Sequence, residues 1–199
     1  MANRKSTARD LAQIAVFAAL IAALGLPGTI YIGANGVPIT LQTLGVMLAG
    51  AILGARKGLL SVVVFLVLAI AGLPILAGGR TGLTALAGPS AGYLVGWLFG
   101  VVVIGLLTAR ILPKYPLWQG ILVNLIGGVL VIYAFGVAWA TVRTDWASAT
   151  ANTLLFLPGD LVKAIVAALV AKQVHRAYPG LMPGVTWTGS QPPTEKVAS

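Results

Sequence analysis

Charge is the first thing that this sequence lacks. Only 9% of its 199 residues are Asp, Glu, Lys or Arg, whereas 58% are hydrophobic, and an average soluble domain has about 25% charged residues. Because so few charges do not cover the surface of a water-soluble fold, we expect lipid to surround most of the chain. A net charge of +9 would suggest nucleic acid on a soluble protein. Here the basic residues lie in the gaps between apolar runs, which argues against a nucleic-acid partner.

Missing residue types exclude several chemistries. There is no cysteine, so disulfides and cysteine-ligated metals are excluded. The single histidine, His175, cannot form a histidine cluster, and we expect it at the membrane interface or in a loop. Nucleotide motifs of the types G-x-x-x-x-G-K-[ST] and G-x-G-x-x-G are absent. The chain has four acidic residues, too few for a carboxylate pair or a two-metal centre in the membrane. We therefore expect neither an enzyme nor a resident cofactor or metal.

What is present is a series of apolar runs separated by turn residues. They predict six membrane helices, at residues 11–26, 40–55, 58–73, 93–112, 117–140 and 158–174. Spans of about 16 to 24 residues fit a hydrocarbon core of ~30 Å once tilt is allowed. The predicted fold class is an all-α integral membrane protein, a six-helix bundle with ordered extracellular loops. Residues 141–157 are expected to form a loop.

The chain divides into three predicted segments. Residues 1–10 are polar and basic, and we expect them in the cytoplasm. Residues 11–176 form the membrane domain. Residues 177–199 are rich in Pro, Gly and Thr, which predicts a disordered cytoplasmic tail.

The basic residues predict the orientation. With the N-terminus in the cytoplasm, ten lysines and arginines lie on the cytoplasmic side, whereas Arg80 and Arg143 lie outside. Six crossings also return the C-terminus to the cytoplasm, so we expect a multi-pass protein of the cell membrane. Three unusual segments then meet on the outer side: the uncharged loop 28–39, the glycine-rich connector 74–92, and the start of the sixth helix.

That sixth helix begins with two ionisable residues in an apolar run, Asp160 and Lys163. Three residues apart on a helix, they share one face. Charges within the membrane are costly unless they are paired, face a wet cavity or serve a function. A self-neutralising ion pair is the simpler reading, but the cost of burying both groups favours a ligand site. Asp160 also lies in a first helical turn, where the positive end of the helix dipole favours a carboxylate.

Other polar residues are expected at the same outer pocket. A ligand site typically combines apolar walls with a few convergent polar groups. The candidates, besides the pair, are Arg80, Tyr93, Gln42, Thr43 and Asn35. Separately, Ala15, Ala19 and Ala23 form a row of small residues on one face of the first helix, where another helix can approach closely. This row predicts either packing within the bundle or docking of another membrane protein.

Several of these segments together resemble the BioY family, the biotin-specific S components of energy-coupling factor (ECF) transporters. The resemblance covers about residues 10–175 and rests on residues 37–45, 72–74, 78–80, 88–93 and 158–163. It implies a six-helix S-component bundle that binds biotin from outside. It also implies a transmembrane coupling protein and two cytoplasmic ATPases as partners, with the alanine row as the docking face for the coupling protein.

For biotin, the ligand implied by this resemblance, Asp160 would accept a ureido N–H. Lys163 or Arg80 would donate to the ureido carbonyl or pair with the carboxylate, and the sequence does not decide which. We expect Asp160→Asn and Lys163→Ala each to weaken binding by ~1 to 3 kcal/mol. The alternatives are an S component for another vitamin, a stand-alone secondary transporter, and a structural membrane subunit without a ligand.

Overall fold

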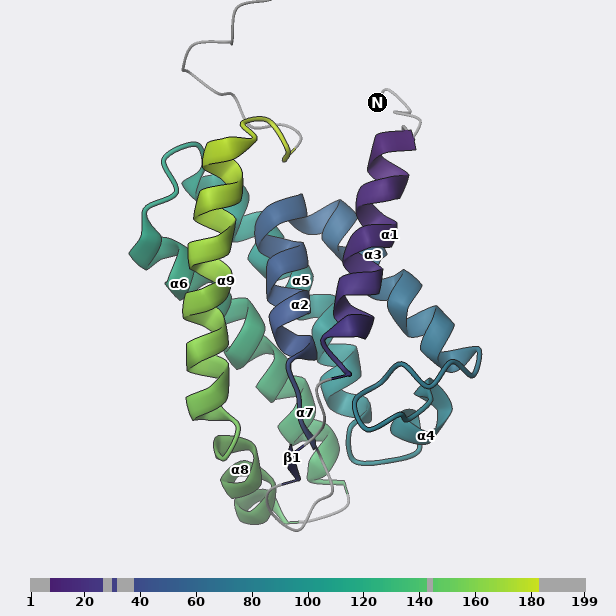
Figure 1. The fold of residues 1–199 in the computed structure, drawn as a ribbon. Coiled ribbons are helices and arrows are strands. Elements are labelled where there is room, and N and C mark those ends of the chain that lie inside the picture. The colour runs from purple at the N-terminus through teal and green to yellow at the C-terminus, as the bar shows by residue number, and fades with distance from the viewer. Residues whose placement is uncertain (1–7, 27–29, 32–37, 143–144, 183–199) are drawn as a thin grey trace, which may run out of the picture.

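The computed structural model describes residues 8–26, 30–31, 38–142 and 145–182 (Figure 1). Its regular secondary structure is helical apart from a short antiparallel strand pair, in which Ile30 lies opposite Ile39, and an isolated antiparallel bridge between Leu76 and Arg80. The elements in order are α1 (Ala8–Ala23), β1 (Ile30–Tyr31), β2 (Pro38–Ile39), α2 (Gln42–Leu48), the π-helical η1 (Ala49–Leu53), α3 (Gly54–Ile70), α4 (Gly82–Leu86), α5 (Ala91–Ile111), α6 (Leu117–Leu125), the π-helical η2 (Ile126–Val131), α7 (Ile132–Ala140), α8 (Trp146–Leu154) and α9 (Leu157–Ala177).

The long helices run between two ends of the molecule (Figure 1). The terminus end, at the top of the view, carries the start of α1 and the end of α9. The loop end, at the bottom, carries β1, α4 and α8. Helix α5 packs against both α3 and α7, so it forms the centre of the bundle.

Within the described residues, three helical segments are long and apolar enough to cross a membrane: Gln42–Ile70, Ala91–Ile111 and Leu117–Ala140. Helices α8 and α9, bent by 48° at their junction, would make a fourth if the pair is one span. The chain is thus a helical protein with the character of a membrane protein, as the composition predicted.

The segment Gln42–Ile70 doubles back on itself. Gly54 has a φ of +81°, and a Cβ on Gly58 would lie 2.9 Å from the carbonyl oxygen of Ala49. Residues nine apart on a straight helix are separated by about 14 Å. The segment therefore forms two packed legs, α2 with η1 and then α3, which correspond to the two predicted runs 40–55 and 58–73.

Two connectors contain helices that the sequence analysis did not anticipate. Helix α8 lies within residues 141–157, which were wrongly expected to be a loop, and α4 lies within the connector 74–92. Each begins at a capping side chain: Asp145 Oδ1 accepts from the Ser148 N–H at 2.9 Å, and Thr81 Oγ1 accepts from the Thr84 N–H at 3.4 Å. Hydrogen bonding from Ser148 also lowers the pKa of Asp145 below its ordinary value. Such caps satisfy otherwise orphaned helix N–H groups.

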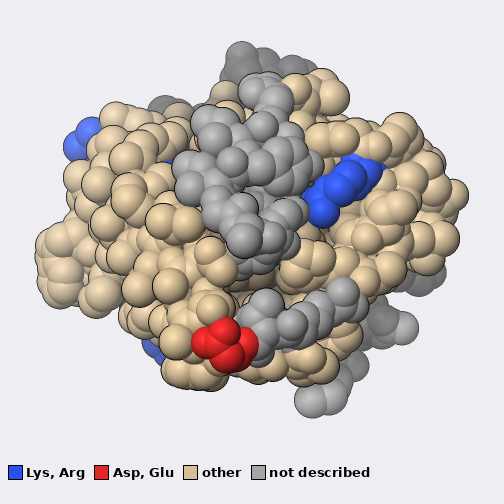
Figure 2. Space-filling view, turned by 90° about the horizontal axis from the view of Figure 1, so that it is seen from below, with Lys and Arg blue, Asp and Glu red and all other residues tan. Residues whose placement is uncertain are grey.

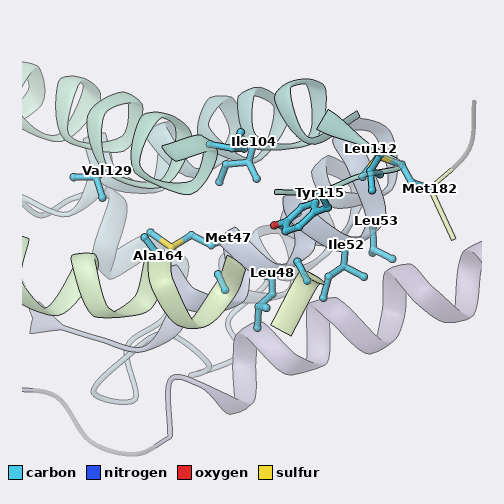
Figure 3. Close-up of a cluster of buried hydrophobic side chains, with 14 residues drawn as sticks. Met47, Leu48, Ile52, Leu53, Ile104, Leu112, Tyr115, Val129, Ala164 and Met182 are labelled. Atoms are coloured by element: carbon cyan, nitrogen blue, oxygen red, sulfur yellow. The ribbon is translucent and has the colours of Figure 1, made fainter. Parts of the chain in front are cut away.

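Buried apolar side chains form two clusters. One joins α2, η1, α5 and α9, and Figure 3 shows Met47, Ile104 and Ala164 within it. The other surrounds Phe65 and Trp97, whose rings lie 6.1 Å apart. Close helix approach replaces the hydrophobic effect as the main source of cohesion between membrane helices.

A glycine row brings α5 close to its neighbours. Three glycines spaced four residues apart on α5, Gly92, Gly96 and Gly100, face α7 and η2. At Gly96, an added Cβ would lie 3.0 Å from the Cα and carbonyl oxygen of Ile132. Larger residues on this face would push the helices apart.

The terminus end differs from the sequence-based expectation. His175 is buried, 2% exposed, and its Nε2 lies 2.8 Å from the Ala51 carbonyl oxygen. Met182, placed by the sequence in the tail, is 3% exposed and packs beside Leu112 in the first cluster (Figure 3). The chain beyond α9 thus remains packed at least as far as Met182.

Candidate ligand-binding site

A pocket lies at the loop end, and its lining combines apolar and aromatic side chains with a few polar groups, the mixture typical of small-molecule sites. Its lining comes from α2, the connector 74–92, α5, α7 and α9. The lining residues are Thr40, Gln42, Thr43, Leu76, Ala77, Arg80, Ser90, Tyr93, Leu94, Trp97, Ile132, Tyr133, Phe156, Asp160 and Lys163. From this end, the described surface shows only isolated charged patches (Figure 2). Three of the lining residues, Arg80, Asp160 and Lys163, are charged.

Lys163 is held by three acceptors. Its Nζ lies 2.6 Å from the Thr40 carbonyl oxygen, 2.8 Å from Asp160 Oδ1 and 3.1 Å from Thr43 Oγ1. A lysine ammonium has three N–H donors, so each has a partner within the protein. Lys163 is 7% exposed and Asp160 4%, so the pair is buried and the hydrogen-bonding capacity of its lysine is fully used.

Asp160 keeps part of its acceptor capacity. Its Oδ1 accepts from Lys163 and, at 3.3 Å, from the Thr43 hydroxyl, and its Oδ2 accepts from the Tyr133 hydroxyl at 2.7 Å. A carboxylate offers about four acceptor sites. One site on Oδ2 therefore has no donor from the described part of the chain, and it belongs to a residue that lines the cavity.

Arg80 has donors to offer. Its Nε donates to the Ala77 carbonyl oxygen at 3.2 Å, and its Nη1 donates to Ser90 Oγ at 3.2 Å. Two of the five guanidinium N–H groups are thus used, and three have no acceptor among the described residues. These two bonds fix the orientation of a side chain that lines the cavity.

Gln42 lines the same cavity, but its amide holds the fold together. Its Nε2 donates to the carbonyl oxygens of Ile21 and Ile75, at 3.2 and 3.0 Å, and its Oε1 accepts from the Ala77 N–H at 2.9 Å. The side chain is 1% exposed. It therefore joins α1 and the connector 74–92 to α2, and it positions the segment that carries Arg80.

Tyr93 links α5 to the bent α8–α9 pair. Its hydroxyl lies 2.7 Å from Thr153 Oγ1, and its ring meets Phe156 edge-on with centroids 6.1 Å apart. Edge-to-face pairs of this kind are favourable aromatic contacts. Tyr93 thus supplies an aromatic wall, with its polar tip already occupied.

The structure brings together six of the seven ligand-site candidates: Gln42, Thr43, Arg80, Tyr93, Asp160 and Lys163. Asn35 lies outside the described residues. Sequence reasoning missed Tyr133, which donates to Asp160. The available signal was a tyrosine within an apolar run, since a buried tyrosine hydroxyl usually finds a partner. Among the described residues, no group of three His, Cys, Asp or Glu side chains is placed to hold a metal.

The alanine row predicted for docking lies on the outside of the molecule. Ala15, Ala19 and Ala23 are all exposed, whereas Ile14, Ala18 and Ile21 on the opposite face of α1 are buried. Leu11 and Val16 beside the row are 58% and 63% exposed. Packing within the bundle therefore does not account for these three alanines.

The fold and the site define a helical membrane protein with a small-molecule pocket at one end of its bundle. A family model described as the BioY family matches residues 1–180. Among curated relatives, the "Biotin transporter BioY" of Rhizobium etli is 47% identical over 178 residues, which cover 86% of this chain and 95% of that protein. The "Biotin transporter BioY" of Rhodobacter capsulatus is 45% identical over 188 residues, covering 87% and 97%.

A solved structure has the same fold. The crystal structure of "the S-component for biotin from an ECF-type ABC transporter" superposes with a TM-score of 0.81 at 33% identity, covering 88% of this chain and 95% of that one. The chain belongs to the BioY family.

Proposed function

We propose that this protein is the biotin-binding S component of an ECF transporter in the cell membrane, which captures biotin at the outer face. The observation that carries the proposal is the pairing of unused groups in one cavity: an acceptor site on Asp160 and guanidinium donors on Arg80. Biotin has complementary groups, namely ureido N–H donors and a carboxylate, separated by apolar atoms. The names of the relatives and the structural neighbour support this ligand.

The hydrogen-bond inventory favours one assignment of the two cations. The three N–H groups of Lys163 already have acceptors, so a ligand would have to displace one of them. Arg80 has donors left and presents the planar fork that matches a carboxylate. We therefore assign the biotin carboxylate to Arg80 and a ureido N–H to Asp160 Oδ2, with Lys163 and Tyr133 holding Asp160 in place.

The six-span topology, with both termini in the cytoplasm, belongs to this proposal. Doubling back at Gly54 turns Gln42–Ile70 into two crossings. Together with α1, α5, α6–η2–α7 and the α8–α9 pair, this makes six. Basic residues are concentrated at the terminus end, as expected for a cytoplasmic side. On this topology the membrane domain extends past residue 176 to Met182, which is buried against the bundle.

The exposed alanine row fits docking of a transmembrane coupling protein, which would act with two cytoplasmic ATPases. Small residues permit close approach of a partner helix. Ala19→Trp should leave biotin binding intact but abolish ATP-dependent uptake in liposomes that contain the ECF module. Val162→Trp, at a 60% exposed site on α9, is the matched control and should not impair uptake. Normal uptake by Ala19→Trp would contradict the proposal that the coupling protein docks on the alanine row.

Equilibrium binding to the purified protein tests the proposed function itself. We expect saturable binding of biotin, no comparable binding of riboflavin or thiamine, and biotin among co-purified small molecules by mass spectrometry. Preferential binding of another vitamin would make the protein an S component of different specificity. Absence of any vitamin binding would favour a structural subunit, and uptake without the ECF module would favour a stand-alone transporter.

A further inference from the structure

A second pocket lies at the terminus end between α1, α3 and α5. Most of its lining is apolar. Its apolar side chains include Ile14, Leu53, Leu60, Leu106 and Met182. Leu60 and Leu106 are also 38% and 51% exposed. The cavity therefore opens on the side of the bundle, where lipid would surround the protein.

The polar edge of this cavity contains one saturated cation. Lys57 Nζ lies 2.6 Å from Gln13 Oε1, 3.2 Å from the Leu181 carbonyl oxygen and 3.4 Å from Asp10 Oδ1. Its three donors are matched by acceptors from α1 and from the chain beyond α9, and the residue is 7% exposed. Lys57 thus ties these segments together and has no donor left for a ligand.

Arg56, the neighbouring cation, is exposed and makes no hydrogen bond or ion pair with the described part of the chain. The terminus end has too few acidic residues to pair with it. Seven cations, Arg9, Arg56, Lys57, Arg110, Lys114, Lys172 and Arg176, share the terminus end with one described acid, Asp10. Asp10 is already bound to Lys57. The cavity therefore joins an apolar groove to an unpaired guanidinium.

We propose that this cavity binds an anionic phospholipid, with its phosphate on Arg56 and an acyl chain along Leu60 and Leu106. Leu60 follows Arg56 by one turn on the same face of α3, so the groove leads from the charged end toward the middle of the bundle. This polarity matches a lipid whose headgroup lies at the membrane surface. Basic pockets between membrane helices favour anionic headgroups. The proposal is independent of biotin binding.

Native mass spectrometry of the full chain, incubated with phosphatidylglycerol or phosphatidylcholine, tests this site. We expect the protein to retain phosphatidylglycerol in preference to phosphatidylcholine. Arg56→Gln should reduce the retention of phosphatidylglycerol about fivefold, the effect expected of one basic side chain beside an anionic lipid. Lys114→Gln removes the same charge at the same end but outside the cavity lining, and it should leave retention unchanged.

Leu106→Trp fills the groove without changing charge, and it too should reduce retention. If Arg56→Gln and Lys114→Gln reduced the retention of phosphatidylglycerol equally, the lipid would be held by diffuse charge attraction and not by a site. If the protein retained phosphatidylcholine equally well, Arg56 would not recognise the headgroup. Both results contradict the proposal. Lipid retention that is seen only after residues 183–199 are removed would also contradict it, because the full chain would then not bind the lipid. Biotin affinity, measured on the same samples, should be unchanged by Arg56→Gln.

Discussion

The two ends of the bundle each contain a buried lysine with three acceptors, yet they differ in what surrounds it. At the loop end, Lys163 binds Asp160, whose side chain is 5% exposed, at 2.8 Å. At the terminus end, Lys57 binds Asp10, whose side chain is 28% exposed, at 3.4 Å. The loop-end pair is therefore shorter and more deeply buried than the terminus-end pair.

What the two ends share separates two roles that look alike in a sequence: a cation that holds other protein groups in place, and a cation that is available to a ligand. A lysine in an apolar environment suggests a ligand contact, but at both ends its donors are used within the protein. The group with donors left is a nearby arginine, Arg80 at the loop end and Arg56 at the terminus end. Burial with full satisfaction therefore indicates a lysine that positions other groups, and incomplete satisfaction indicates the cation available to a ligand.

The largest expected difference between the ends concerns their acids. Asp160→Ala leaves Lys163 buried beside only neutral oxygens, and removing one partner of a buried pair costs about 3 to 5 kcal/mol. Asp10→Ala should cost less than about 1 kcal/mol, as for exposed pairs, because Lys57 keeps Gln13 and Leu181. Thermal unfolding in detergent, followed by circular dichroism, should show a far larger loss for Asp160→Ala. Equal losses would contradict the contrast between the two pairs.

Glycines near each end make a second comparison. A Cβ on Gly105 would collide with the backbone of Ala55, whereas a Cβ on Gly136 would collide with the Tyr93 ring. Backbone cannot easily move, so Gly105→Ala should lower stability by about 1 to 3 kcal/mol, as overpacking does, without changing biotin affinity. Gly136→Ala should cost less stability but weaken biotin binding, because it displaces a wall of the pocket.

Unfolding temperature should therefore fall more in Gly105→Ala, whereas biotin affinity should fall more in Gly136→Ala. Gly159→Ala is the control, because a Cβ there meets nothing within 4 Å. If Gly136→Ala binds biotin normally, Tyr93 does not shape the site.

The smallest expected effect comes from two threonine hydroxyls. Thr43 donates to Asp160 and accepts from Lys163, so Thr43→Val should cost about 1 kcal/mol. Thr108, near the end of α5, has a buried hydroxyl without a partner among the described residues. Thr108→Val should therefore be neutral or stabilising. A greater loss of unfolding temperature in Thr108→Val than in Thr43→Val would contradict this reading of the hydrogen bonds.

The sequence predicted the helical membrane class and the family, and both are confirmed. Apolar runs and turn residues are local signals, so most helices were placed to within a few residues. It did not predict α8, because the Asp145 cap lies in a polar stretch that also fits a loop. Burial of Met182 depends on contacts with Gly54 and the first apolar cluster, which are distant in sequence.

The residues of the candidate site and an acceptor role for Asp160 were predicted, but the division of roles between Lys163 and Arg80 was not. The cost of burying charged groups and the predicted topology, which put all three on the outer side, together predicted that Asp160, Lys163 and Arg80 share a site. Gln42 was expected at the ligand, yet its amide is bound by Ile21, Ile75 and Ala77. Which donors remain free depends on such backbone partners, and no residue pattern encodes them. The roles of all these residues toward biotin remain predictions.

One measurement tests the central claim, that Arg80 and not Lys163 receives the biotin carboxylate. Isothermal titration of biotin and biotin methyl ester into the wild-type protein and Arg80→Gln separates charge recognition from the rest of the site. We predict that Arg80→Gln weakens biotin binding about tenfold to a hundredfold, as expected for loss of a charged hydrogen bond of about 1.5 to 3 kcal/mol, and changes ester binding little. Equal losses for both ligands, or no loss for biotin, would contradict the account.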